Sequence, residues 1–350
     1  IGSFSLVSNV AGDKATAVGY GAMQYINNSG STFENKNVAV GFEALRGSDT
    51  PANNTGEENV ALGYSSLWQN TSGHDNTAIG TEVLFKNTIG QNNTAIGSQS
   101  LYENITGDWN TAIGIQSLFS NESGIRNVAI VANSLYYNIS GELNTATGYH
   151  ALENNESGES NTGNGAMALS GNISGNNNTA IGHKALVENR AGSFATAIGA
   201  HAMEYANNTS ATFDNYNVAV GFEALKGSPV PSSNTGNKNI AIGYQTLVDN
   251  TSGDENTAIG YKTLTNNTEG DQNSAFGHEA MTSNVNGDFN TAFGDRSLTA
   301  NTSGSYNTAI GLGSLQANIF GDDNTALGDV ALFLNTTGSN NTAIGSSALA

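Results

Sequence analysis

The stretch Asn76-Thr77-Ala78-Ile79-Gly80 recurs along the whole chain and decides its fold. Identical copies begin at Asn93, Asn110, Asn178, Asn256, Asn307 and Asn341. Its last residue, here named the anchor glycine, recurs every 17 residues, except for steps of 22 from 19 to 41, 41 to 63, 199 to 221 and 221 to 243. Such a period indicates a repeat architecture, in which each short unit buries its apolar face against the next one.

A longer period is superimposed on the short one. The anchors Gly19, Gly41 and Gly63 return as Gly199, Gly221 and Gly243, which is an offset of 180 residues. The nine residues 37–45 are also identical to residues 217–225. We therefore predict a first super-unit over residues 1–198, with a partial leading turn, and an incomplete second one over residues 199–350, within one continuous solenoid.

The 17-residue unit reads G-x-x-(A/S)-L-x-x-N-x-(S/T)-G-x-x-N-T-A-I. It contains two short β-strand candidates, N-T-A-I and a segment centred on A/S-L, separated by turn signals. Asn and Gly at the corners tolerate the positive φ of tight turns, and each apolar run is too short for a helix. The pattern predicts an all-β fold, a parallel β-solenoid or β-roll of about 20 turns whose strands stack about 4.8 Å apart.

Strand periodicity assigns the side chains to faces. Thr77 and Ile79 share one face, and Ala78 takes the other. We expect the Ile row, with the Leu or Met four residues after each anchor, to supply the main core. The Ala row then requires a tight contact, inside the thin coil or against another chain. Because strands apolar on both faces are usually covered on both, we expect self-association as a homotrimer; a monomer with Ala inside is the alternative.

Charge and composition exclude several classes of partner. The chain carries 30 acidic against 11 basic residues, a net charge of −19, which disfavours nucleic acid and anionic membrane surfaces. It has no cysteine. No apolar run approaches the roughly 20 residues of a membrane span, so we expect no membrane insertion in this segment. The chain begins Ile1-Gly2, and we expect it to be part of a longer precursor.

Asparagine recurs at one corner of each unit and again before the strand threonine. Stacked Asn amides hydrogen-bond along the axis of fibrous β structures, and this is the structural interpretation of both rows. The rival interpretation is N-glycosylation, because the corner asparagines stand in Asn-x-Ser/Thr motifs or at equivalent places. The candidate acceptors are Asn70, Asn104, Asn121, Asn138, Asn155, Asn172, Asn250, Asn301 and Asn335.

The 22-residue units carry longer loops, where binding residues often lie on a regular scaffold. All three prolines of the chain, Pro51, Pro229 and Pro231, stand there. Aromatic residues gather in the same zone of each super-unit, at Tyr25, Phe33 and Phe42 and again at Tyr205, Phe213 and Phe222. They either cap a locally wider core or contact a receptor or a neighbouring fibre.

Features typical of catalysis are missing from the repeat pattern. The five histidines share no ligand spacing, and no nucleotide-binding, zinc-protease or serine-hydrolase motif occurs. We therefore expect no enzymatic activity, cofactor or metal. One stretch departs from the pattern, because Val131 replaces an anchor glycine and the next two units lack the strand Ile. We expect residues 131–165 to be the least well packed.

The Asn-Thr-Ala-Ile-Gly-x-x-Ala-Leu units resemble the head repeats of YadA-type trimeric autotransporter adhesins and related tail-fibre proteins with an endosialidase-type chaperone. The resemblance implies a left-handed parallel β-roll, usually trimeric, displayed outside the cell to attach to host surfaces, matrix, glycans or other cells. We expect an extracellular structural or adhesive protein, either a surface adhesin head or a fibre shaft. The alternatives are a repeating subunit of a glycosylated filament and, from the row of strand threonines, an ice- or polysaccharide-binding module.

Overall fold

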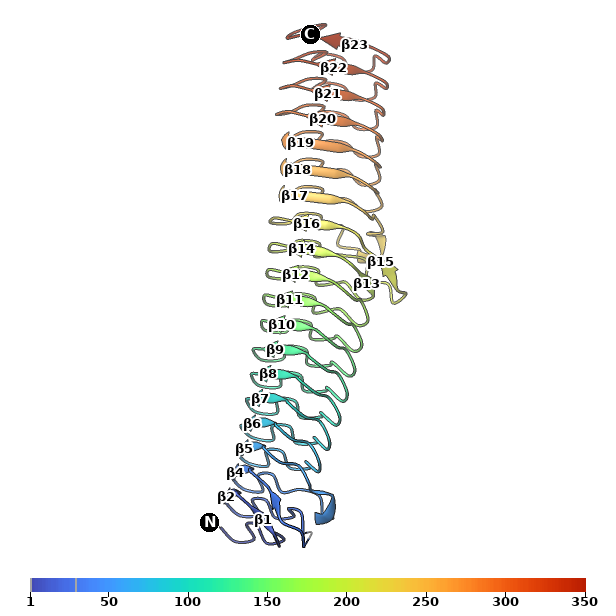
Figure 1. The fold of residues 1–350 in the computed structure, drawn as a ribbon. Helices are drawn as coiled ribbons and strands as arrows, with labels where there is room; N and C mark the ends of the chain where they lie inside the picture. Colours follow the sequence, from blue (N-terminus) through green and yellow to red (C-terminus); the bar gives the residue numbers. More distant parts are fainter. Residues whose placement is uncertain (1, 29) are drawn as a thin grey trace. The chain divides into compact units, whose positions relative to one another are not determined.

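The recurring Asn-Thr-Ala-Ile segment forms one short strand in each turn, and successive strands pair in parallel (Figure 1). A computed structural model describes residues 2–28 and 30–350. It confirms an all-β parallel solenoid of about twenty turns with the 17-residue repeat. By its contacts the chain forms two compact units, here unit 1 (residues 1–175) and unit 2 (residues 176–350). The super-unit boundary at residue 198 follows sequence similarity and stays a prediction.

Unit 1 contains one parallel sheet and a two-stranded pair. The sheet runs through β2 (Thr16–Val18), β4 (Val38–Val40), β5 (Val60–Leu62), β6 (Thr77–Ile79), β7 (Thr94–Ile96), β8 (Thr111–Ile113), β9 (Val128–Ile130), β10 (Thr145–Thr147) and β11 (Thr162–Asn164). The separate pair is formed by β1 (Gly12–Asp13) and β3 (Phe33–Glu34), and a 3-10 helix, η1, covers Pro51–Asn53.

Unit 2 repeats this plan. Its sheet runs through β12 (Thr179–Ile181), β14 (Thr196–Ile198), β16 (Val218–Val220), β17 (Ile240–Tyr244), β18 (Thr257–Tyr261), β19 (Ser274–His278), β20 (Thr291–Phe293), β21 (Thr308–Ile310), β22 (Thr325–Leu327) and β23 (Thr342–Ile344). The separate pair is β13 (Gly192–Ser193) with β15 (Phe213–Asp214), and the 3-10 helix η2 covers Pro231–Ser233.

Strand register follows the repeat period. Ile96 pairs with Ile113 across a 17-residue step, and Val218 pairs with Ile240 across a 22-residue step. The five additional residues of the longer turns therefore leave the main register intact. The longer turns carry β3, β15 and the two 3-10 helices, and β3 and β15 pair with β1 and β13 of the 17-residue turns that precede them.

The core consists of the Ala and Leu rows, and the expectation that the Ile row lies inside is wrong. Ala112 and Leu118 are fully buried, whereas Ile113 is 37% exposed. The physical reason is the width of the coil. At Gly163, which replaces Ala in its turn, an added Cβ would lie 3.1 Å from the Ala168 carbonyl oxygen. A methyl group just fits there and a longer side chain does not, so the larger β-branched residue faces outward.

The strand predicted around the Leu row does not form. The Leu and Met residues of this row lie in turns, with φ between 48° and 56°, as at Leu101 (φ 51°) and Leu118 (φ 51°). The prediction that corner Asn and Gly would supply positive φ is also only partly correct. The anchor glycines do so, whereas the corner asparagines do not. The left-handed conformation lets the Leu118 N–H donate along the axis to the Ser134 carbonyl oxygen at 3.0 Å.

Residues 131–165 are as well buried as the turns beside them. Ala146 and Leu152 have no exposed surface, and β9, β10 and β11 remain paired in register. The expectation of poor packing is therefore not supported by burial. The backbone of Val131 is nevertheless irregular, with a φ of 94°.

Helical structure in the described residues is limited to the two 3-10 helices. Within this part of the chain, no helix has the length and apolar character needed to cross a membrane.

Candidate functional site

The corner asparagines form a continuous hydrogen-bonded row within each unit. Asn87 Nδ2 donates to Asn70 Oδ1 at 2.7 Å and to the Gly90 carbonyl oxygen at 2.9 Å. Asn104 repeats the pattern one turn later, donating to Asn87 Oδ1 at 2.7 Å. The predicted stacking of Asn amides along the axis is therefore confirmed.

These contacts bear directly on the candidate glycosylation sites. In all nine, the amide nitrogen that would carry a glycan donates to the carbonyl oxygen of the residue three positions later. Eight of them are at most 4% exposed, and Asn335 is half-buried. Because a glycan would displace buried hydrogen bonds, this geometry disfavours glycosylation of the folded chain at Asn70, Asn104, Asn121, Asn138, Asn155, Asn172, Asn250, Asn301 and Asn335.

A second buried row is formed by the asparagines that precede the strand. Asn93 Nδ2 donates to Asn76 Oδ1 at 3.1 Å and to the Gly107 carbonyl oxygen at 2.8 Å. The Asn93 backbone N–H also donates to Asn76 Oδ1 at 3.0 Å. Two rows of this kind satisfy the buried turn carbonyls, which explains how a thin coil with little apolar volume stays closed.

The outward face of the sheet carries the Ile row, defined here as the third residue of each three-residue strand segment. Ile96, Ile113 and Ile130 in unit 1 are 36–37% exposed. Ile198 and Ile310 in unit 2 are 37% and 38% exposed. Each unit therefore presents a line of mostly apolar side chains at strand spacing, which Thr147 and Asn164 interrupt in unit 1 and which includes Phe276 and Phe293 in unit 2. An exposed apolar surface of this kind marks an interaction site.

The six predicted contact aromatics do not form one cluster. Phe42 stacks between Tyr20 and Tyr64, at centroid distances of 5.2 and 5.4 Å. Tyr25 instead lies under Arg46, whose Cζ is 4.6 Å from the ring centroid, and Phe33 belongs to the outlying pair as part of β3. The predicted contact aromatics of unit 1 therefore lie at separate places, on the surface and in the loops.

Unit 2 separates its aromatics in the same way. Phe222 stacks on Tyr244 at 5.5 Å, and that row continues through Tyr261 to His278. Tyr205 and Phe213 line a cavity.

Sequence reasoning missed a longer aromatic stack in unit 1. The rings of Trp68, Phe85, Tyr102, Phe119 and Tyr136 lie 5.0–5.2 Å apart and within 4° of parallel. All five occupy the place immediately after the Leu row, and this register was the signal that could have revealed them. Burial raises the pKa of the Tyr102 and Tyr136 hydroxyls.

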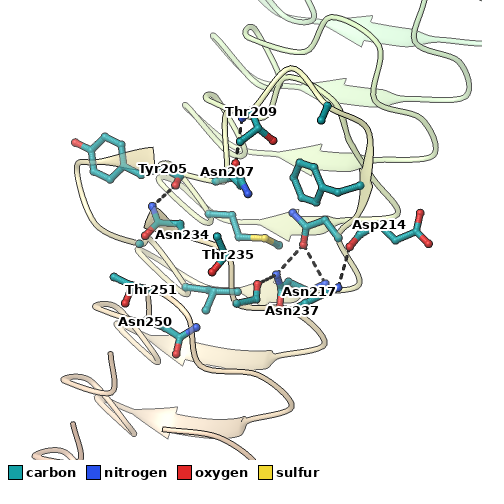
Figure 2. Close-up of a pocket in the computed structure, with 18 of the residues that line it drawn as sticks. Tyr205, Asn207, Thr209, Asp214, Asn217, Asn234, Thr235, Asn237, Asn250 and Thr251 are labelled. Carbon is teal, nitrogen blue, oxygen red and sulfur yellow. Dashed lines mark hydrogen bonds between the residues drawn. The ribbon is translucent and has the colours of Figure 1, made fainter. Parts of the chain in front are cut away.

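The cavity lies among the paired 22-residue turns of unit 2 and has a volume of about 260 Å³. Figure 2 shows its polar lining, with Asn234 directed to the Tyr205 backbone. Asn217 Nδ2 donates to the Gly236 carbonyl oxygen at 2.8 Å, and Asn237 Nδ2 donates to the Asp214 carbonyl oxygen at 2.8 Å. Asn side chains thus hold the two long loops together around an open space.

A network of charged groups holds the turn beside this cavity. Glu204 is 5% exposed and its Oε2 lies 3.0 Å from His201 Nδ1. Lys184 and Lys226 each place Nζ 3.7 Å from a Glu204 oxygen. Hydrogen bonds from Lys226 and Gln245 lower the pKa of Glu223. The carboxylate of Glu204 is therefore compensated by cations around it.

The described residues contain no group of three or more His, Asp or Glu side chains placed to hold a metal ion. Neither a scan against protein-family models nor a search of curated proteins finds a match to this chain.

Proposed function

We propose that this chain is an extracellular, non-catalytic structural or adhesive protein, the head of a surface adhesin or the shaft of a fibre. The observation that carries the proposal is the uniformity of its turns. Nearly every coil is filled by the same Ala, Leu and Asn rows, and the Ile row faces outward in most of them. This design suits a scaffold that displays long linear surfaces.

The Ile row supports self-association. A second copy of the chain carries the same mostly apolar side chains at the same axial spacing, so two Ile rows would pack against each other turn by turn. Burying them removes apolar surface from water, which stabilises association by about 25 cal/mol per Å². The homotrimer implied by the resemblance to YadA-type heads would bring three such rows together.

The exposed aromatic stacks support adhesion. Tyr20, Phe42 and Tyr64 in unit 1, and Phe222 with Tyr244 in unit 2, stand on an outer edge and are 42–51% exposed. Tyr and Phe combine a large contact area with little conformational entropy and are enriched in binding surfaces. A host surface, matrix protein or glycan is the partner that this proposal assigns to them.

The alternative is a repeating subunit of a long extracellular filament. The observation that favours it is the 180-residue offset between the two sets of long turns. Such an offset would set an axial repeat if more super-units follow. Glycosylation of that filament would have to use asparagines outside the buried corner row.

Sedimentation equilibrium of the 36.0 kDa chain tests the proposal. We expect three times this mass for the wild type and the monomer mass for a triple variant of the Ile row, Ile96→Lys, Ile113→Lys and Ile130→Lys. The matched control places three lysines on the exposed corner instead, as Ile105→Lys, Glu122→Lys and Ile139→Lys, and should keep the wild-type mass.

Each remaining outcome is decisive. Open-ended growth, with filaments visible by electron microscopy, supports the filament alternative. A wild-type monomer at all concentrations, or equal masses for the two triple variants, contradicts assembly through the Ile row. Attachment of the labelled wild-type chain to surfaces coated with matrix protein or glycan then tests the adhesive part.

A further inference from the structure

The cavity of unit 2 has the composition of a site for a small neutral molecule. Its apolar lining comes from Met203, Phe213 and Leu225 with Ala206 and Ala211, and the remaining lining is mostly Asn and Thr. Asp214 is the one charged residue among the lining residues. At about 260 Å³ the space lies just below the roughly 300–1,000 Å³ of pockets for drug-sized ligands, so it accommodates a single ring.

One amide of the cavity lining keeps an accessible donor. Asn215 is 4% exposed, and its Oδ1 accepts from Asn217 Nδ2 at 2.7 Å and from the Asn217 backbone N–H at 3.2 Å. Within residues 30–350 the Asn215 Nδ2 makes no hydrogen bond, and it is not among the fully buried polar atoms. It is therefore free to donate to an oxygen atom of a bound molecule.

The corresponding loops of unit 1 show what controls the size of the space. Offset by 180 residues, Met23, Tyr25, Phe33, Asn35 and Asn37 match their unit 2 counterparts in residue type. Among the buried residues that line the cavity, residue 206 is the one that differs, because unit 2 has Ala206 where unit 1 has Ile26. Ile26 is 4% exposed and lines a hollow of about 10 Å³ with Leu45 and Asn54. The isoleucine fills space that alanine leaves open.

We propose that the cavity of unit 2 binds one neutral sugar ring, free or at the end of a glycan, and that Ala206 makes room for it. Sugar hydroxyls both donate and accept, which matches amide and hydroxyl groups that do the same. The ring of Phe213 offers an apolar surface for the C–H face of a sugar. The lining lacks Lys and Arg and the chain carries a net charge of −19, so anionic ligands are disfavoured. This site goes beyond the proposed function and does not require assembly.

Titration calorimetry and saturation-transfer NMR on the full chain test the site. The probes are D-glucose, D-galactose, D-mannose and N-acetyl-D-glucosamine, and each sugar is titrated separately into the chain. We expect at least one of them to bind at a stoichiometry of one, and Ala206→Ile to weaken that binding at least tenfold. Ala206→Val adds a smaller side chain and should weaken binding less, and hydrogen exchange verifies that both variants keep wild-type protection. Ile26→Ala should open a second binding site in unit 1 and raise the stoichiometry to two sugars per chain.

Several results would overturn the site. They are the absence of saturation transfer to all four sugars, binding that Ala206→Ile leaves unchanged, and an unaltered stoichiometry in Ile26→Ala. Binding of the neutral peptide acetyl-Gly-Asn-Gly-amide in the same place, with none of the sugars, would reassign the cavity to peptide recognition and equally overturn it.

Discussion

At the scale of single residues, the fold depends on backbone conformations that side chains normally avoid. The anchor glycines have φ between 121° and 154°. At Gly114 (φ 135°) an added Cβ would lie 2.6 Å from the Val131 carbonyl carbon of the next turn. Val131 occupies an anchor place itself, with a φ of 94°. A β-branched residue with positive φ is a clear outlier and stores about 1–3 kcal/mol of strain.

We predict that Val131→Gly stabilises the chain by about 1 kcal/mol. The relieved strain exceeds the additional entropy that glycine brings to the unfolded state, which is about 0.4–1 kcal/mol. Hydrogen exchange of residues 114–148 measures the effect locally, which suits a repeat protein whose turns open in sections. Gly114→Val is the opposite change and should reduce protection of the same residues. Lower protection in Val131→Gly would show that this backbone is not strained.

A second residue-scale prediction separates the two interpretations of the corner asparagines. Asn104→Ala removes a donor to Asn87 Oδ1 and to the Gly107 carbonyl oxygen, and it removes the acceptor of Asn121 Nδ2. We expect a loss of about 2–4 kcal/mol in local stability, because each buried group left unsatisfied costs about 1–3 kcal/mol.

Thr106→Ala is the matched control for this change. It destroys the same Asn-x-Thr motif, but the Thr106 side chain is exposed. We expect hydrogen-exchange protection of residues 87–121 to fall in Asn104→Ala and to stay unchanged in Thr106→Ala. An equal loss in both variants would indicate that the motif matters as a glycosylation signal.

At the scale of elements, the paired long turns are held by specific polar contacts where the regular rows are interrupted. In unit 2, Lys226 Nζ lies 2.7 Å from Glu223 Oε1, and Gln245 Nε2 donates to Glu223 Oε2 at 2.7 Å. The Gln245 bond joins consecutive turns beside the cavity, and the Lys226 contact lies within one turn. They stabilise the ionised form of Glu223, so the pKa of its carboxyl is lower in the folded chain than the ordinary 4.5.

The sign of the pH effect follows from this lowered pKa. The stabilisation by Glu223 is fully present above pH 4.5 and is lost as the pH falls through the lower folded pKa. Since the group is partly exposed, we expect less than about 1 kcal/mol. Glu223→Gln should lower the protection of residues 221–245 at pH 6 and approach wild type at pH 3. A difference that grows toward acid pH would contradict this role.

At the scale of the whole molecule, repetition made the solenoid predictable, because anchors at 17-residue steps define both the strand and its partner. The sequence did not decide which strand face lies inside. Ala78 and Ile79 are both apolar, and only the width of the coil, seen at Gly163, excludes the larger one. The turn conformation of the Leu row could not be predicted from the sequence either, because Leu has no preference for positive φ.

The candidate sites were predictable to different degrees. The two Asn rows and the long loops followed from position in the repeat. The cavity depends on the difference between Ala206 and Ile26, whose meaning emerges only once the loops are folded over it. The five-ring stack depends on Trp68 and four other aromatics sharing one register place, which is visible in an aligned sequence but not from composition.

Disulfide formation between engineered cysteines tests the stacked coils most directly, and the chain has no native cysteine to interfere. Ile96 and Ile113 are register partners, so their Cα atoms lie about 4.8 Å apart, within the range that a disulfide spans. Ile96 and Thr111 are offset by two residues and lie about 8 Å apart, which is beyond that range. We predict rapid oxidation of Ile96→Cys/Ile113→Cys in the folded chain and none of Ile96→Cys/Thr111→Cys. Equal oxidation of both pairs, or bridging of the second alone, would contradict coils stacked in 17-residue register.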